Sequence, residues 1–366
     1  MTPEAAGVDP RHDPGVSAAR ERAERVPLAS ATIVRAGGAG GIRVGTAGWT
    51  DRTLTAPGVF YPAGVTTPRD RLAYYASRFP LVEVDAPFYA LPTREQAELW
   101  VSRTPPDFVF DVKAFALLTG HPTEATRLPR DLVRELPEPV RQKGRIYARD
   151  LPGELLEAVW ERFLDALAPL EAAGKLGVVL FQYPRWFLPN RGSEETLLDV
   201  KRRLERAGYT AAIEFRNRRW MEERLRERTL GLLEAQRLPY VMVDEPQGLE
   251  SSVPPVVAVT SPRFAVLRMH GRRADVWEKP NVTVAERYRY LYDRDQLADW
   301  VPKVAAAAKA TREVHVVYNN CYANYGTTNA LEFTQLLLAA GAPPPSSSAA
   351  DRVGGGEVVP DGGGLR

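Results

Sequence analysis

The chain has very little cysteine: Cys321 is the only one among its 366 residues. One thiol cannot form an intrachain disulfide, and it excludes a zinc site built from several cysteines. Histidine is also scarce, with four residues and no HExxH or HxH motif, so a histidine-based zinc site is not indicated. This composition fits a protein of a reducing compartment.

A marked excess of one charge and long hydrophobic runs are absent too. The 48 Lys and Arg residues against 46 Asp and Glu leave a net charge of +2, which does not indicate a nucleic-acid or membrane partner. No uninterrupted apolar run approaches the roughly 18 residues that a membrane helix needs. Residues 1–26 carry scattered charges and no apolar core, so a secretory signal is not expected. We therefore expect a cytoplasmic protein without a membrane partner.

The two ends of the chain differ in composition from its middle. Residues 1–40 are rich in Ala, Gly, Arg and Pro and lack sustained hydrophobic periodicity, so we predict a disordered N-terminal tail. Residues 341–366 form a low-complexity C-terminal tail by composition. Between them, residues 41–340 have the size of one barrel-sized domain.

Eight short runs rich in β-branched residues lie along this middle region, and most are separated by segments with helical spacing. The runs are residues 42–49, 81–89, 108–115, 176–184, 211–216, 240–245, 265–271 and 313–320. Eight strands alternating with helices predict a TIM-type (β/α)8 barrel, with an open doubly wound sheet as the alternative. Residues 120–150, after the third strand, read as an insertion that forms a lid or a flank.

Most of the predicted strands become polar toward their carboxyl ends, where a barrel of this type carries its active site. Side chains alternate between the two faces of a strand, so parity suggests which of them face the lumen. The polar residues selected in this way are Glu83, Asp85, Asp111, Lys113, Gln182, Glu214, Arg216, Asp244, Arg268, His270, Asn319 and Asn320. The pattern favours a functional pocket over its alternative, a buried salt-bridge network that only closes the barrel.

An ordered series of motifs resembles a known family. The motifs are GTAGW (45–49), FYP (60–62), VEVDAPFYALP (82–92), FDVKA (110–114), LFQYP (180–184), IEFRNRRW (213–220), LRMHGR (267–272) and YNN (318–320) with NA (329–330). Over residues 42–338 the chain is similar to the YecE-like family, catalogued as domain of unknown function seventy-two. The resemblance implies a TIM barrel with a polar cleft, and it implies no settled activity.

The resemblance also implies particular site positions. Its polar positions match Glu83, Lys113, Glu214, Arg216, Arg268, His270 and Asn320, and its aromatic positions match Trp49, Tyr61, Phe88, Tyr89, Phe181 and Trp220. Two places depart from the family pattern. Asp85 stands where an amide is usual, and Gly120 separates Thr119 from His121, which puts a role of that histidine in doubt.

These residues together suggest an enzyme, hydrolase- or isomerase-like, that uses acid–base chemistry. We expect Glu83, Glu214 and His270 to transfer protons. The ligand-binding set is Trp49, Tyr61, Asp85, Tyr89, Lys113, Gln182, Arg216, Asp244, Arg268, Asn319 and Asn320. Because arginine pairs with carboxylates and phosphates, the expected ligand is polar and anionic, such as a sugar phosphate or a nucleotide-like molecule.

Several alternatives stay open at this point. A non-catalytic protein that binds nucleic acid or another anionic ligand would use the arginine-rich loops around Arg218 and Arg272. A carboxylate-rich site also accommodates Mg²⁺ or Mn²⁺ without any histidine motif, so a divalent-metal cofactor is an open question. His270 can equally be a structural histidine bonded to a carboxylate, and Cys321 a small buried residue.

Overall fold

The computed structural model describes residues 9–28, 31–35 and 41–341, and its centre is a barrel of eight parallel strands. The strands are β2 (Gly41–Ala47), β3 (Leu81–Val84), β4 (Val109–Lys113), β5 (Leu176–Gln182), β6 (Ala211–Glu214), β7 (Val241–Asp244), β8 (Phe264–Met269) and β9 (Glu313–Tyr318). Each strand pairs in parallel with the next except for β6 and β7, and β9 pairs with β2. All eight predicted strands are confirmed.

The pairing between β6 and β7 is the shortest in the barrel. A single parallel bridge links Ile213 to Tyr240, and the Ile213 amide donates to the Pro239 carbonyl at 2.8 Å. This bridge completes the circuit of strands, so the open doubly wound alternative does not hold. A short additional strand, β1 (Val34–Arg35), pairs antiparallel with the amino end of β2.

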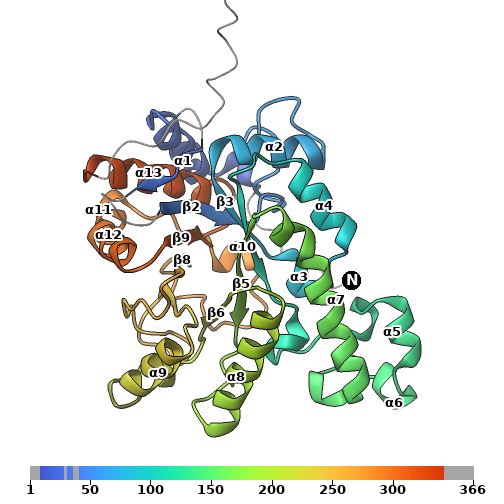
Figure 1. Cartoon of the computed structure of the whole chain (residues 1–366). Coiled ribbons are helices and arrows are strands. Elements are labelled where there is room, and N and C mark those ends of the chain that lie inside the picture. The colour runs from blue at the N-terminus through green and yellow to red at the C-terminus, as the bar shows by residue number, and fades with distance from the viewer. Residues whose placement is uncertain (1–8, 29–30, 36–40, 342–366) are drawn as a thin grey trace, which may run out of the picture.

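Helices surround the strands (Figure 1). They include α2 (Pro68–Arg78), α4 (Arg94–Ser102), α7 (Gly153–Ala172), α8 (Arg191–Arg206), α9 (Glu223–Ala235), α11 (Arg294–Ala298), α12 (Val301–Ala310) and α13 (Tyr325–Ala339). Helix α8 illustrates their origin. The Asn190 side chain caps it by accepting from the Ser193 amide, and Leu197, Val200 and Leu204 form the buried stripe. Between β7 and β8 the described chain has no helix, and residues 246–262 there are rich in Pro, Ser and Val.

The insertion after β4 folds as a flank beside α7. It contains the short helices α5 (Arg130–Glu135) and α6 (Glu138–Arg141), which lie on the outer side of α7 in Figure 1. Leu132 and Ile146 are buried in the main hydrophobic core, and Arg162 of α7 forms an ion pair with Asp131. The insertion is therefore tied to the barrel by apolar burial.

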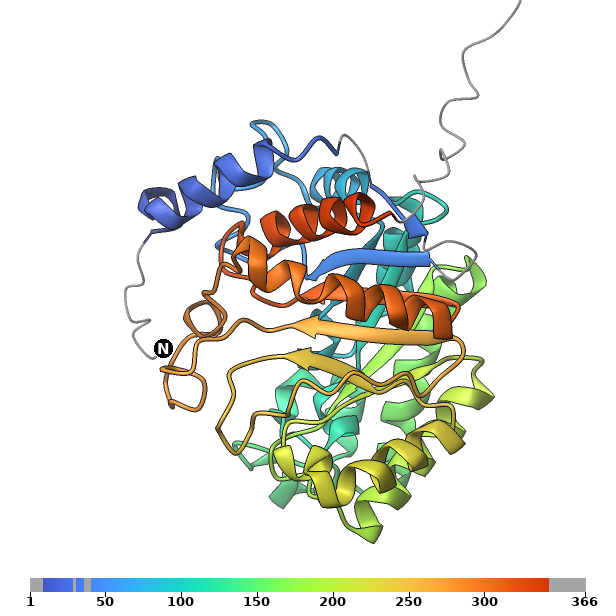
Figure 2. The same ribbon diagram turned by 90° about the vertical axis from the view of Figure 1, so that its left-hand side faces the viewer.

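The N-terminal segment is more structured than its composition predicts. Helix α1 (Pro14–Glu24) begins at Asp13, whose side chain accepts from the Gly15 amide, and it lies beside α13 in both views (Figures 1 and 2). Val16 and Ala19 are buried, and Arg22 donates to both carboxylate oxygens of Glu332, at 2.8 and 2.7 Å. The prediction of a disordered tail is wrong for this helix, because contacts with α13 far along the chain stabilise it.

The remaining predictions about the ends concern residues outside the described ranges. Residues 1–8, 29–30, 36–40 and 342–366 are not described, so the low-complexity C-terminal tail stays a prediction. Among the described residues, the helices are too short or too polar to cross a membrane.

Candidate functional site at the carboxyl end of the barrel

Arg268 lies at the centre of the lumen and joins three strands. Its guanidinium donates from Nε to Glu83 Oε2 at 2.9 Å and from Nη2 to Glu83 Oε1, and it donates from Nη1 to Glu214 Oε2 at 2.6 Å. All three side chains are at most 1% exposed. Strand β8 thus reaches across the barrel to β3 and β6, and two carboxylates share one guanidinium. The prediction that Arg268 faces the lumen is confirmed.

Glu214 accepts further hydrogen bonds through its other oxygen, Oε1. Gln182 donates from Nε2 at 2.7 Å, Arg216 from Nη1 at 3.3 Å, and His270 Nε2 lies 3.2 Å away. On the far side of the ring, the Asn319 amide nitrogen lies 2.9 Å from His270 Nδ1. Glu214 is therefore the most heavily hydrogen-bonded group of the lumen.

The two glutamates differ in their electrostatic surroundings. Burial raises the pKa of Glu83 to about 7, in spite of the opposing charge of Arg268. Burial also acts on Glu214, but Arg268, His270 and Arg216 together hold the pKa of Glu214 well below its usual range. A pair of carboxyl groups whose pKa values are pushed apart is the arrangement that divides acid and base roles in enzymes.

His270 is neutral at physiological pH. Burial lowers its pKa to about 3, against the opposing effect of Glu214. A neutral ring that donates from Nε2 to Glu214 and accepts at Nδ1 from Asn319 satisfies both contacts. The structural interpretation of His270, as a histidine bonded to a carboxylate, fits this geometry better than titration near neutrality.

Asp244 faces away from the lumen. Arg272 donates to it from Nε at 2.8 Å and from Nη2 at 2.6 Å, and Tyr292 Oη and Trp300 Nε1 each donate at 2.8 Å. In the parallel register Asp244 is opposite Met269, which points outward. The prediction that Asp244 faces the lumen is wrong, and this carboxylate instead links β7 to the loop after β8 and to the start of α12.

Glu245, which the sequence analysis did not select, takes the inward position. Val243 pairs with Arg268 in the register, so the next residue on that face is Glu245. Arg216 Nη1 donates to Glu245 Oε2 at 3.0 Å, and the Val253 amide donates to Oε1 at 2.6 Å. Burial raises the pKa of Glu245 to about 7. That the Glu245 side chain faces the lumen can be deduced only once the pairing of β7 with β8 is known.

Two further polar residues lie nearer to solvent, above Glu83 and Arg268. The side chains of Asp85 and Lys113 are 32% and 13% exposed, and Lys113 Nζ lies 3.5 Å from Asp85 Oδ1. That oxygen is buried and accepts no hydrogen bond from the described residues. Burial opposes the charged form of Lys113, but Asp85, Glu83 and Tyr288 together raise the pKa of Lys113. Asp85 Oδ1 thus has acceptor capacity that no described hydrogen bond uses.

Four rings form a partly exposed aromatic strip beside this pair. Successive centroid distances are 5.2 Å from Tyr89 to Phe88, 5.1 Å from Phe88 to His121 and 5.8 Å from His121 to Trp186. Tyr89 and Trp186 are each 54% exposed, and Lys113 Nζ lies 4.7 Å from the centre of the Phe88 ring. We call Tyr89, Phe88, His121 and Trp186 the aromatic strip. Only Tyr89 was selected from the sequence as a ligand residue.

Gly120 forms a turn that brings the side chains of Thr119 and His121 together. Gly120 has a φ of +77°, a conformation that favours glycine, and the turn lets Thr119 Oγ1 approach His121 Nδ1 to 2.8 Å. Burial, with Lys113 and Arg216 nearby, lowers the pKa of His121 to about 4, so the ring is neutral. Although Gly120 departs from the family pattern, His121 therefore still lies between Phe88 and Trp186 in the aromatic strip.

The loop after β8 covers His270. The Trp277 ring lies 6.0 Å from the His270 ring and the Tyr288 ring 6.1 Å, while the Arg216 guanidinium lies 4.7 Å from the centre of Trp277. Figure 2 shows this loop extending beyond the arrowheads of the parallel strands. The cover explains why His270 is fully buried although it follows the end of its strand.

Three residues predicted to bind ligand lie apart from this cluster. Trp49 is in the hydrophobic core, 6.3 Å from Trp100 of α4. The Tyr61 hydroxyl donates to the Trp49 carbonyl, and the Asn320 amide donates to Asn329 of α13 at 2.9 Å. The structure does not bring Trp49, Tyr61 or Asn320 to the lumen, because strand ends and loops turn them toward the helices. Two other family-pattern aromatics, Phe181 and Trp220, are also buried in the core.

A second buried ion cluster lies deeper in the lumen, toward the amino ends of the strands. His315 Nδ1 lies 2.9 and 3.0 Å from the Asp111 oxygens, and His315 Nε2 lies 3.2 Å from Glu313. A side chain at Gly177 would meet Asp111 Oδ1 at 2.2 Å, so glycine is required beside this pair. Burial opposes ionisation, but Asp111 and Glu313 raise the pKa of His315 to about 9. Asp111 is thus part of a structural ion pair.

This cluster predicts a loss of stability in alkaline solution. A histidine whose pKa rises from 6.5 to about 9 on folding stabilises the protein fully below pH 6.5, and that contribution is lost as the pH rises through 9. We expect the free energy of unfolding to fall by up to about 3 kcal/mol between these limits. Urea denaturation at several pH values measures it. His315→Gln should flatten this part of the profile, and an unchanged profile in the variant would contradict the assignment.

The described residues contain no group of three or more His, Cys, Asp and Glu side chains arranged to hold a metal ion. The free thiol of Cys321 is partly buried, and burial raises its pKa above the ordinary range. A thiol of this kind is a poor nucleophile.

The fold and the site define a class: a (β/α)8-barrel protein whose lumen holds an ion-paired network at the carboxyl end. Within that class, the chain belongs to the family described as Protein of unknown function DUF72, which matches residues 43–351. The resemblance to the YecE-like family is thereby confirmed, since the two names denote one family.

Several relatives agree with this assignment. The UPF0759 protein YunF of Bacillus subtilis (strain 168) is 31% identical over 299 residues, which are 81% of this chain and 94% of the relative. A crystal structure of a DUF72 family protein from Enterococcus faecalis V583 has a TM-score of 0.64 at 26% identity, covering 81% of this chain and 95% of that one. One from Thermotoga maritima MSB8 has a TM-score of 0.63 at 28% identity, covering 81% and 99%.

Proposed function

We propose that this protein is an enzyme that carries out acid–base chemistry on a neutral, polyhydroxylated ligand at the carboxyl end of the barrel. The observation that carries the proposal is the pair Glu83 and Glu214, which share the Arg268 guanidinium and have pKa values displaced in opposite directions. A carboxyl group with a pKa of about 7 both donates and accepts protons near neutral pH. A purely structural network has no need of such a group.

In this proposal Asp85 is the acceptor for a ligand hydroxyl group. It lies two residues beyond Glu83, just after the end of β3, and its buried Oδ1 has no hydrogen-bond donor among the described residues. A ligand hydroxyl bound between Asp85 and Lys113 stands directly above Glu83, which is itself 1% exposed. In this proposal Glu83 holds the proton that is exchanged, Asp85 and Lys113 orient the hydroxyl, and Glu214 stays ionised to anchor Arg268.

The charge balance favours a neutral ligand over the anionic one expected from the sequence. Three cations, Lys113, Arg216 and Arg268, are each within ion-pair distance of a carboxylate. The carboxylates of the cluster are Glu83, Asp85, Glu214 and Glu245. A phosphate would have to displace one of these partners and would meet four acidic groups, whereas hydroxyl groups donate to carboxylates without that cost.

The arginine-rich loops give little support to nucleic-acid binding. Arg272 is bound to Asp244, and Arg273 forms ion pairs with Asp275 and Glu286. Arginines that are held by carboxylate partners neutralise few phosphates, so they displace few of the counterions condensed on a nucleic acid. The non-catalytic alternative would nevertheless be favoured if the protein bound oligonucleotides with an affinity that fell steeply as salt was raised.

The aromatic strip supplies an apolar face for a sugar-like ring. We expect Trp186→Ala to weaken binding of the ligand by roughly tenfold or more, because stacking on one aromatic ring contributes about 1–3 kcal/mol. The fold should be unaffected, since Trp186 is 54% exposed. Isothermal titration with the ligand found in the experiment below measures the effect. Leu99→Ala, at another exposed apolar residue, is the matched control. If the Trp186→Ala variant bound the ligand as tightly as the wild type, the aromatic strip would have no part in ligand binding.

The test of the proposed function is proton exchange with solvent. The purified protein is incubated in D2O with panels of aldoses, ketoses, aryl glycosides and the corresponding sugar phosphates, and the mixtures are followed by NMR. Deuterium incorporation at carbon indicates isomerase-like chemistry, and new sugar signals indicate hydrolysis. The proposal predicts turnover of a neutral compound that is lost in the Glu83→Gln variant. Turnover of phosphorylated compounds alone would contradict the neutral-ligand assignment, and full activity of Glu83→Gln would contradict the catalytic one.

A further inference from the structure

The buried network of the lumen has little contact with solvent. Glu83 and His270 are at most 1% exposed, and the rings of Trp277 and Tyr288 lie 6.0 and 6.1 Å from the His270 ring. We call residues 273–289, which carry both of these rings, the cover loop. A ligand reaches the buried groups only after part of their cover has moved, so the contacts that hold the cover loop in place control access to the His270 side of the lumen.

The cover loop is tied together by its own side chains. Arg287 donates to the carbonyls of Val276 and Lys279, at 3.1 and 2.9 Å. Arg273 Nη1 lies 3.1 Å from Glu286 Oε1. These bonds join the first half of the loop to the second, so we expect it to move as one body.

Both ends of the cover loop are fixed to the barrel. At its start, Arg272 donates to both carboxylate oxygens of Asp244, at 2.8 and 2.6 Å. At its end, the Asn320 side chain donates to the Tyr290 carbonyl at 2.8 Å. Any movement of the cover loop therefore turns about these two ends.

On the lumen side, the body of the cover loop is held partly by contacts that solvent reaches. Glu278 is exposed and accepts from the amide and the hydroxyl of Ser251, at 2.9 and 2.8 Å. The Arg216 guanidinium lies 4.7 Å from the centre of the Trp277 ring. Because water replaces an exposed hydrogen bond at little cost, the Glu278 contacts offer limited resistance to opening.

On the outer side, the cover loop is held by helix α1. Arg289 Nη2 donates to Asp13 Oδ2 at 2.7 Å, and Asp13 also accepts from the Tyr322 hydroxyl at 2.9 Å. The Asp13 side chain is only 4% exposed, so this ion pair is shielded from water on the carboxylate side. Ala285 of the cover loop packs against an apolar cluster that includes Val16 of α1. A shielded, charged hydrogen bond contributes more than an exposed one, so α1 is a strong support of the loop.

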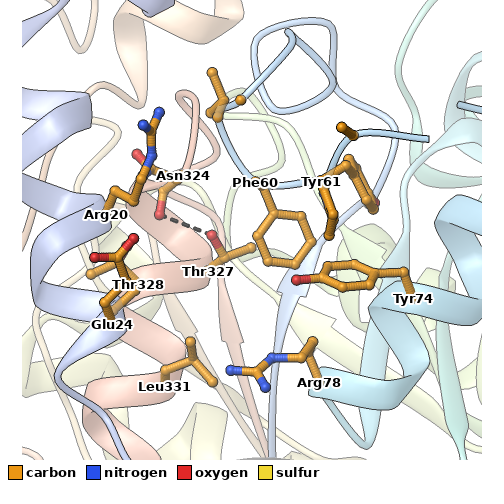
Figure 3. A pocket seen from close by; sticks show the side chains of 15 residues that line it. Arg20, Glu24, Phe60, Tyr61, Tyr74, Arg78, Asn324, Thr327, Thr328 and Leu331 are labelled. Carbon is orange, nitrogen blue, oxygen red and sulfur yellow. Dashed lines mark hydrogen bonds between the residues drawn. The ribbon is translucent and has the colours of Figure 1, made fainter. Parts of the chain in front are cut away.

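Helix α1 is in turn fixed to α13. Asn324 Nδ2 donates to the Val16 carbonyl at 3.1 Å, and Thr328 Oγ1 donates to the Ala19 carbonyl at 3.0 Å. Both side chains lie next to α1 in Figure 3. The helix precedes the family-matched region, which begins at residue 43. The support of the cover loop is thus a firm one, and it comes from outside that region.

We propose that α1 is a clasp that holds the cover loop closed over the lumen, and that breaking the Asp13–Arg289 pair frees the loop to open and admit a ligand. Asp13 is a positioning residue in this arrangement, because it acts on the lumen through Arg289 and the rings of the cover loop. The proposal rests on the proposed function for what enters the lumen, whereas the movement itself is measured without any ligand.

Hydrogen exchange, followed by mass spectrometry on the full-length protein, tests the clasp. Asp13→Asn keeps a side-chain oxygen that caps α1 but loses the charge that holds Arg289. In this variant and in Arg289→Gln, the amides of residues 273–289 should exchange roughly tenfold faster than in the wild type, because a hydrogen bond between charged groups is lost. The double variant should exchange no faster than either single one.

Glu21→Gln, at an exposed ion pair with Arg25 on the same helix, is the matched control and should change nothing. Exchange of residues 273–289 within about twofold of the wild type in both single variants would overturn the proposal. An equal acceleration in α8 would also overturn it, because the whole fold would then have been weakened.

Access to the lumen is measured by modifying histidines with diethyl pyrocarbonate and mapping the products by mass spectrometry, with the partly exposed His121 as the internal reference. His270 should react slowly in the wild type and roughly tenfold faster in Asp13→Asn, whereas His315, at the amino end of the lumen, should not change. An unchanged His270, or an equal rise at His315, would overturn the proposal. Full activity of Glu83→Gln would instead contradict the proposed function and leave the clasp standing.

Discussion

Replacing Arg268 by methionine should lower the free energy of unfolding by about 3–5 kcal/mol at pH 7. The side chain is fully buried and is the shared partner of Glu83 and Glu214, so its removal leaves two carboxyl groups in the lumen without their cation. Methionine keeps much of the volume, so the loss reports charge and not a cavity. Urea denaturation, compared at constant m-value, measures it.

A rescue variant separates the electrostatic explanation from simple damage to packing. Adding Glu83→Gln and Glu214→Gln to Arg268→Met removes the stranded carboxyl groups and should recover most of the lost stability, because buried amides cost far less than buried charges. If Arg268→Met lowered stability by less than about 1 kcal/mol, or if the triple variant were no more stable than the single one, the shared-guanidinium account would be contradicted.

Replacing Glu83 by glutamine should reduce the rate of the catalysed reaction by roughly 10²–10⁴-fold, the usual contribution of a positioned acid or base. Glutamine has nearly the shape of the protonated carboxyl group and keeps one oxygen that accepts from Arg268, but it exchanges no proton with a ligand. The reaction identified by solvent exchange provides the measurement. Asp275→Asn, at an exposed ion pair with Arg273, is a matched control and should retain the wild-type rate.

The Glu83→Gln substitution should also change how the free energy of unfolding depends on pH. The pKa of Glu83 is raised on folding from 4.5 to about 7, so its contribution to stability is fully present below pH 4.5 and is lost as the pH rises through 7. Glu83→Gln removes this dependence. A rate loss in the variant without a change in the stability profile over that window would mean that Glu83 acts in some other way than by holding a proton.

Strand alternation predicted much of the lumen correctly. The polar periodicity of LRMH placed Arg268 and His270 on one face, and the same rule placed Glu83 and Glu214 opposite them, as the structure has it. These positions lie inside or next to regular strands, where alternation holds without knowledge of the neighbours. Hydrophobic periodicity also sufficed for the eight strands themselves.

Positions at strand ends needed the tertiary structure. Asp244 and Glu245 are adjacent acidic residues at the end of β7, and only the pairing of Val243 with Arg268 decides which of them faces inward. Trp186 follows β5 in a loop, and its exposure beside His121 depends on where the insertion after β4 folds. Helix α1 was missed because its two buried residues give little periodicity; its stability comes from α13.

The most direct test of the account is a pH titration of the glutamate carboxyl carbons by ¹³C NMR, with Glu83→Gln and Glu214→Gln used to assign the two signals. We expect Glu83 to titrate near pH 7 while Glu214 stays ionised to the lowest pH at which the fold persists. If the two carboxyl groups titrated together near pH 4.5, neither an acid–base division between them nor the proposed chemistry would stand.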